Sequence, residues 1–226
     1  MIFKLNNTSF PIIPNQTQTI IFDMDGLLVD SEPLWKLAEK KVFGNYGLQL
    51  TDDLLRQVMG FRLSEVVQYW YRYQPWENFN AEQTEREIIE YMIEAIQTHA
   101  QALPGVREVL EQYASAGYKL AVASSSAMVL IETVVKKLGI ASYFELLYSA
   151  EFEPYGKPHP GIFIHAAHKL NTASHQCVVL EDSINGVVAG KAARMFCVAV
   201  PEHISYNDPR FAIADAKIPS LVHLLK

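Results

Sequence analysis

Two carboxylates that directly follow a short apolar run are the first residues in this chain whose types and spacing could do chemistry. The apolar run at residues 20–22 leads into Asp23 and Asp25, and Gly26 follows. A short run without alternation predicts a strand that is buried on both faces. Residues two apart on an extended chain point to the same side, so both carboxylates would crowd one small volume at the strand end. Such crowding is costly unless a cation lies between the two charges.

Polar side chains also follow three later strand-like runs, at the point where each run ends. In chain order they are Ser124, Lys157, Glu181 and Asp182. Ligands of open α/β sheets bind outside the carboxyl ends of the strands. Carboxylate oxygens suit Mg²⁺, and a lysine is a suitable point charge for a phosphate. Each residue alone fits a helix cap or a solvated loop, but their order at successive strand ends predicts a site for a hard cation and a phosphate.

The elements that must position these residues alternate between strand and helix from residue 103 onward. We expect strands at 19–23, 119–123, 144–148, 177–180 and 195–200. We expect helices at 106–116, 128–138, 161–170 and 185–193, with a last edge element and a helix in the tail. Alternation of this kind predicts an α/β fold with a doubly wound parallel sheet and right-handed crossovers.

The stretch from Glu32 to about Ala102 has a different pattern. It contains four helical stripes, at residues 34–42, 54–59, 63–71 and 82–99, and no convincing strand. We therefore expect an inserted helical domain at residues 32–102, directly after the first strand. Residues 19–31 and 103–226 would form the α/β core domain, and residues 1–18 an irregular N-terminal extension.

Composition limits the classes of partner. Lys and Arg number 19 against 25 Asp and Glu, which gives a formal net charge of -6 and no basic stripe for nucleic acid. Cys177 and Cys197 lie in apolar runs, where we expect buried, inert thiols. No signal peptide opens the sequence, and no apolar run is long enough for a membrane span. We expect a cytoplasmic monomer that binds neither membrane nor nucleic acid.

Four short motifs resemble those of the haloacid dehalogenase-type phosphohydrolase superfamily, which has a Rossmann-like core. They are DMDG at Asp23, AVASSS at Ser124, GKPHP at Lys157 and LEDSINGV at Glu181 and Asp182. The similarity runs from Thr19 to the C-terminus, and the helical insertion resembles the C1-type cap of that superfamily. The segment SEPLW and the stretch MGFRLSEVVQYWYRYQPW look most like bacterial hexitol-phosphate and 2-deoxyglucose-6-phosphate phosphatases.

The resemblance implies a role for each polar residue at the strand ends. Asp23 would be the nucleophile that forms an aspartyl-phosphate, and Asp25 would be the general acid and base. Ser124 and Lys157 would hold the phosphoryl oxygens. These are the four expected catalytic residues.

The same resemblance implies a Mg²⁺ site and a substrate site. Asp23, the backbone carbonyl of Asp25 and Asp182 would hold the metal, with Glu181 in support. The expected substrate-binding residues are Gly60, Arg62, Ser125 and Ser126. Arg62 would reach the substrate from the cap, because a guanidinium suits phosphate or polyol hydroxyls. The resulting prediction is a Mg²⁺-dependent phosphatase of small sugar or polyol monophosphates.

Two other functions remain open at this point. A β-phosphoglucomutase would share the four motifs and the cap, but such mutases carry a histidine where this chain has Trp35 and a lysine where it has Ala127. A receiver domain of a signalling protein is also an α/β fold phosphorylated on aspartate. Receivers have no helical insertion after the first strand, so the insertion argues against that function.

Overall fold

The computed structural model describes residues 12–225 of the chain, and its centre is a six-stranded sheet of parallel strands in the order β3-β2-β1-β4-β5-β6. The strands are β1 Thr19–Phe22, β2 Lys119–Ser124, β3 Leu146–Ser149, β4 Cys177–Glu181, β5 Phe196–Ala199 and β6 Ala216–Lys217. The order runs outward in both directions from β1. The predicted doubly wound α/β fold is therefore confirmed.

The central strand β1 explains why its sequence lacks alternation. Ile20, Ile21 and Phe22 are all fully buried, because helices cover both faces of the sheet. Phe22 lies beside Val122 of β2 on one side and Leu180 of β4 on the other. This register brings the residues that follow the three strands to the same edge of the sheet.

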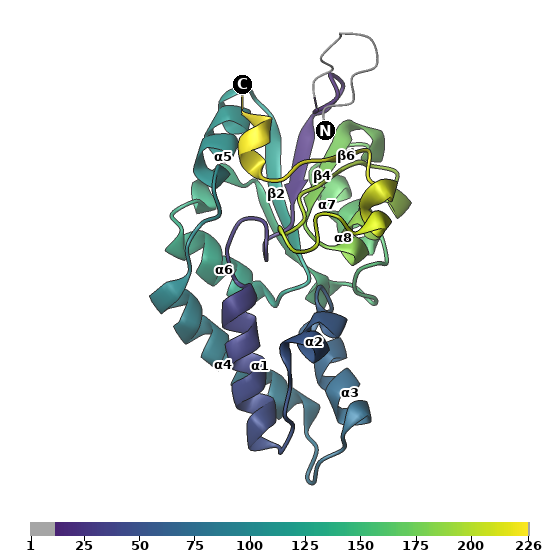
Figure 1. Ribbon diagram of the computed structural model, residues 1–226. Coiled ribbons are helices and arrows are strands. Elements are labelled where there is room, and N and C mark those ends of the chain that lie inside the picture. Colours follow the sequence, from purple (N-terminus) through teal and green to yellow (C-terminus); the bar gives the residue numbers. More distant parts are fainter. Residues whose placement is uncertain (1–11, 226) are drawn as a thin grey trace.

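Helices cover the two faces of the sheet in pairs (Figure 1). One face packs on α5 (Val106–Ser115) and α6 (Met128–Lys137). The other face packs on α7 (Gly161–Lys169) and α8 (Ile184–Ala192). The side chains of β1 alternate between these two apolar layers, which is the arrangement that a buried parallel sheet requires.

The helical segment after β1 comprises α1 (Glu32–Asn45), α2 (Asp52–Leu55), a 3₁₀ turn at Arg56–Val58, α3 (Leu63–Tyr73) and α4 (Ala81–His99). In Figure 1 these helices lie beyond the carboxyl ends of the strands. Helix α4 packs against α1 and α3, and it also packs against α6 of the α/β part. No strand lies within residues 32–99, all of which the structure describes.

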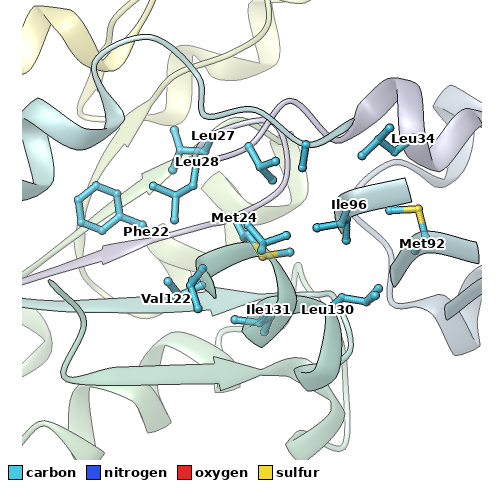
Figure 2. Close-up of a cluster of buried hydrophobic side chains, with 14 of the residues drawn as sticks. Phe22, Met24, Leu27, Leu28, Leu34, Met92, Ile96, Val122, Leu130 and Ile131 are labelled. Atoms are coloured by element: carbon cyan, nitrogen blue, oxygen red, sulfur yellow. The ribbon is translucent and has the colours of Figure 1, made fainter. Parts of the chain in front are cut away.

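A shared apolar cluster joins the helical segment to the sheet. Met24, just after β1, belongs to the same cluster as Ile96 of α4 and Leu130 of α6, and Figure 2 shows all three. All three side chains are almost completely buried. The α/β part and the helical segment are therefore packed together on this side, and the space between them must lie elsewhere.

Element ends differ from the sequence-based expectations by a few residues. Strand β3 begins at Leu146, after a 3₁₀ turn at Ala141–Tyr143, and the expected last helix is only a 3₁₀ turn at Leu221–Leu224. Residues 12–18 have no helix or strand, as expected, and residues 1–11 of the expected N-terminal extension lie outside the described residues. Within 12–225, every helix is too short or too polar to cross a membrane.

The two cysteines are buried and free, as predicted. Burial raises the pKa of the Cys177 thiol to about 11 and also raises the pKa of Cys197. Both groups are therefore protonated and unreactive at neutral pH.

Candidate active site

A buried ammonium group links the ends of three strands. Lys157 Nζ donates hydrogen bonds to Asp23 Oδ1 at 2.6 Å, to Glu181 Oε1 at 2.6 Å and to the carbonyl oxygen of Ala123 at 3.0 Å. Only 4% of Lys157 is exposed, and its two carboxylate partners are also buried. The contacts bring together residues that are 134 and 24 positions apart in the chain. This is the convergence at one sheet edge that the sequence predicted.

Three carboxyl groups at this edge form a cluster that suits a metal ion. Oxygens of Asp23, Glu181 and Asp182 all lie within 4.8 Å of one another. Burial raises the pKa of Asp23 to about 8 against the opposing effect of Lys157, and burial also raises the pKa of Asp182 well above its usual range. One ammonium thus does not fully compensate three buried carboxyl groups, and a divalent cation would favour their ionised forms. Carboxylate oxygens are the ligands that hard cations prefer, so the residues fit such an ion.

Gly26 is needed where the chain turns past this cluster. Its φ is +69°, and a Cβ placed on it would overlap with Asp182 Oδ2. Replacing Gly26 would therefore impose a left-handed backbone strain and also displace a carboxylate of the cluster.

We expect Gly26→Ala to weaken the binding of a divalent cation at this cluster at least about tenfold, because the added methyl group displaces one of its three carboxyl groups. Gly47→Ala is the matched control, since Gly47 has φ +86° and open space around its Cβ position. Both variants should lose roughly 1–2 kcal/mol of stability from backbone strain. Titration of activity with Mg²⁺ checks the difference, and equal activation curves for the two variants would contradict it.

The side chain of Asp25 lies outside the carboxyl cluster and accepts several hydrogen bonds. Ser31 Oγ donates to Oδ1 at 2.6 Å and Trp35 Nε1 donates to Oδ1 at 2.9 Å. Ser126 Oγ donates to Oδ2 at 2.6 Å, and Ser124 Oγ donates to the same oxygen at 3.4 Å. The Asp25 carboxylate is therefore fixed by donors from both the helical segment and the α/β part.

The remaining predicted residues divide between the cavity and its rim. Ser125 Oγ donates to the carbonyl oxygen of Gly60 at 3.0 Å, so these two expected substrate residues contact each other across the two parts of the molecule. Both line the same cavity as Asp23, Asp25, Ser124, Ser126, Lys157 and Asp182.

Arg62 lies at a different place from the one expected. It is absent from the cavity lining, and its guanidinium donates to the carbonyl oxygen of Glu153 at 2.9 Å and to Glu65 Oε1 at 3.0 Å. Its side chain therefore ties the start of α3 to the loop after β3. In this arrangement the guanidinium is directed at main-chain carbonyls of that loop, and its contact with substrate stays a prediction.

The cavity lies between the strand ends and the helical segment. Its wall on the helical side is largely apolar and includes Leu55, Val58, Met59, Phe61, Leu63 and Val66. The polar residues of that wall come from helix α1 and from Arg56 of the 3₁₀ turn. Those of α1 are Glu32, Trp35, Lys36 and Glu39.

Comparisons with known proteins identify the family. The profile described as Haloacid dehalogenase-like hydrolase matches residues 20–200, which is most of the chain. The chain belongs to this family.

Members of the family with known names are similar along almost the whole chain. Hexitol phosphatase B of Escherichia coli strain K12 is 40% identical over 212 residues, which cover 93% of this chain and 96% of that protein. The phosphorylated carbohydrates phosphatase of Thermotoga maritima is 32% identical, over 92% of this chain and 98% of that protein. Both names denote phosphatases, so the expected enzyme class, a phosphoric monoester hydrolase, is confirmed.

Solved structures of the family share the fold. A crystal structure of β-phosphoglucomutase from Clostridium difficile matches with a TM-score of 0.82 and 24% identity, over 92% of this chain and 93% of that one. At this identity the likeness concerns the fold alone and does not separate a phosphatase from a mutase.

The role of α1 in lining the cavity was not predicted from the sequence. In the sequence, Trp35 marks only a difference from the β-phosphoglucomutases, and nothing distinguishes Glu39 from other helix residues. A signal was present, because Glu32, Trp35 or Lys36, and Glu39 recur at the spacing of one helix face. The sequence does not predict that this face of α1 borders the cavity, because residues 34, 38 and 42 form the apolar stripe of the helix and lie on a different face.

Burial affects the Glu39 carboxyl strongly and gives a prediction about stability. Its pKa is raised to about 7 from 4.5. The folded state therefore keeps a proton that the unfolded state releases, so this group lowers the free energy of unfolding as pH rises from 4.5 to about 7. We expect the unfolding free energy of Glu39→Gln to exceed that of the unmodified chain by a margin that grows by up to about 3 kcal/mol over this window.

Urea denaturation at several pH values measures this margin. The difference between the two proteins isolates Glu39 from other groups that titrate in the same range. If the difference in unfolding free energy between the two proteins stayed constant from pH 4 to pH 8, the raised pKa of Glu39 would be contradicted.

Proposed function

We propose that this protein is a Mg²⁺-dependent phosphatase that hydrolyses small sugar or polyol monophosphates, with residues 32–102 as its cap domain. The observation that carries the proposal is the buried set of Lys157, Asp23 and Glu181 beside Asp182, at the base of a cavity that the helical segment covers. Hexitol phosphatase B and the phosphorylated carbohydrates phosphatase, to which the chain is similar, support the substrate class.

In the proposed reaction Asp23 attacks the phosphorus atom. A bond forms between its carboxylate oxygen and phosphorus, and the bond from phosphorus to the sugar oxygen breaks. Protonated Asp25 gives its proton to the leaving sugar oxygen. Ionised Asp25 then takes a proton from a water molecule, which attacks the aspartyl-phosphate, releases inorganic phosphate and restores Asp23.

Other residues hold the groups that react. Lys157 orients the Asp23 carboxylate through its 2.6 Å hydrogen bond, and together with Ser124 it would bind the phosphoryl oxygens. Asp23, the Asp25 carbonyl and Asp182, with Glu181 in support, would hold Mg²⁺. The metal would supply positive charge that stabilises the transferring phosphoryl group.

The donors around Asp25 suit its proposed role. Ser31, Trp35 and Ser126 all donate to its carboxylate at 2.9 Å or less. Together they hold the Asp25 side chain in one position at the cavity. The indole N–H of Trp35 can only donate, so it orients the Asp25 carboxylate oxygen that accepts its hydrogen bond.

A substrate panel tests the proposed function. We expect release of inorganic phosphate from hexose and hexitol phosphates in the presence of Mg²⁺, loss of release after chelation with EDTA and recovery when Mg²⁺ is restored. β-Glucose 1-phosphate is included, and free phosphate and glucose 6-phosphate are assayed separately. Formation of glucose 6-phosphate without net phosphate would show a mutase instead, and no turnover of any monophosphate would refute both activities.

A further inference from the structure

Helix α1 presents two polar groups to the cavity at different depths. Trp35 and Glu39 are four residues apart and both line the cavity, so they lie on one face of the helix, separated by about one turn of 5.4 Å. Trp35 contacts the carboxylate of Asp25. Glu39 therefore lies about one helical turn along α1 from the residue that contacts Asp25. Because Asp25 is the proposed proton donor to the leaving oxygen, a leaving group with a chain of several carbons would reach Glu39.

The carboxyl group of Glu39 lacks the partners that buried carboxyls normally have. Only 8% of the residue is exposed, and Trp70 Nε1 donates to Oε2 at 3.3 Å. Among residues 12–225, no side chain or main-chain group donates to Oε1, and this atom is not among those sealed from solvent without a partner. Oε1 therefore keeps some accessible surface, and the cavity is the space that Glu39 lines.

The surroundings of Glu39 do not compensate its charge. Apolar residues such as Leu55, Leu63 and Val66 line the same cavity. Its two cations from the helical segment, Lys36 and Arg56, are paired with Glu32 and Asp53. Burial raises the pKa of Glu39, so the group costs stability in the absence of a ligand. An acceptor that the protein leaves without a donor is available to a ligand that supplies one.

We propose that Glu39 binds hydroxyl groups of the leaving sugar or polyol and thereby selects polyhydroxylated monophosphates. This inference rests on the proposed phosphatase function. A carboxylate can accept hydrogen bonds from two neighbouring hydroxyls, and a site built to bind a hydroxyl discriminates against substrates that lack it. The apolar wall opposite Glu39 would pack on the carbon chain of the same substrate.

The test compares two substrates that differ in the leaving group. Sorbitol 6-phosphate carries hydroxyls along its chain, and phenyl phosphate carries none. The readout is the ratio of kcat/KM for sorbitol 6-phosphate to kcat/KM for phenyl phosphate, measured at pH 8 with saturating Mg²⁺. In Glu39→Gln we expect this ratio to fall about 10- to 100-fold, mainly through KM, because the substrate hydroxyls would bind a neutral amide in place of a charged carboxylate. Glu39→Leu, which has no acceptor, should lower the ratio at least as far.

Glu153→Gln is the matched control. Glu153 is also a buried glutamate, and it accepts a hydrogen bond from Tyr148 Oη at 2.8 Å, but it does not line the cavity. We expect the ratio of the two kcat/KM values in Glu153→Gln to stay within twofold of the ratio in the unmodified chain. Circular dichroism and thermal unfolding identify any variant that has not folded, and Glu39→Gln is the more conservative of the two cavity variants.

The outcomes separate this inference from the proposed function. If the unmodified protein hydrolyses neither substrate, the phosphatase function itself fails. If it hydrolyses both and the Glu39 variants lose the two activities in equal proportion, Glu39 is structural and the inference is wrong. A third substrate, glucosamine 6-phosphate, tests for a cation site. A strong preference for it that disappears in Glu39→Gln would also overturn the assignment to hydroxyl groups.

Discussion

Asp23→Asn is expected to lower phosphate release by at least about 10⁴-fold, because an amide cannot act as the attacking nucleophile. The variant should still fold. The asparagine side chain would keep an acceptor for Lys157 Nζ, which lies 2.6 Å from Asp23 Oδ1. The change also removes one negative charge from a cluster in which three carboxyls meet within 4.8 Å. We therefore expect a melting temperature at or above that of the unmodified chain.

A coupled assay for inorganic phosphate, together with thermal unfolding, measures both parts of this prediction. Asp52→Asn is a suitable control, because Asp52 is exposed at the start of α2 and its side chain pairs with Lys40 on the surface. Turnover of Asp23→Asn within tenfold of the unmodified chain would show that another group attacks phosphorus.

Lys157→Met is expected to remove activity and to destabilise the fold by roughly 3–5 kcal/mol, the cost of breaking a buried ion pair by deleting one partner. The Lys157 ammonium contacts two buried carboxylates at 2.6 Å each. Among the described residues, no other cation forms an ion pair with Asp23 or Glu181. Methionine fills a similar volume but leaves both carboxylates without compensation.

Urea denaturation measures the loss, and Lys40→Met provides the comparison. Lys40 pairs with Asp52 on the surface, with 43% of its side chain exposed, so its removal should cost no more than about 1 kcal/mol. If Lys157→Met unfolded at the same urea concentration as Lys40→Met, the ion pairs of Lys157 would not stabilise the fold by the amount expected.

Sequence patterns could predict the α/β part and the strand-end residues, because both depend on local and repetitive features. The buried run before Asp23 and the alternation of strands and helices indicate a parallel sheet, and a parallel sheet brings strand ends together at one edge. Contacts of Lys157 with Asp23 and Glu181 follow from that geometry alone. No side-chain detail was needed.

The cavity wall formed by the helical segment could not be predicted in the same way. Which face of α1 borders the cavity depends on how α1 packs against α4, and no periodicity encodes that choice. Glu39 looks like an ordinary helix residue in the sequence. Arg62 was expected at the substrate because of its chemistry, but its guanidinium binds main-chain carbonyls of the loop after β3, which no sequence pattern distinguishes from a substrate.

The way in which the chain passes between its two parts determines how the cavity can open. The two crossings lie side by side, since Val29 and Ala102 form an antiparallel bridge and Asp30 N donates to the carbonyl oxygen of Gln101 at 3.1 Å. Two crossings paired in this way would act as a single hinge, about which the helical segment would rotate relative to the α/β part. That rotation would part Trp35 from Asp25 and leave the Lys157 cluster, which belongs wholly to the α/β part, assembled for the next substrate.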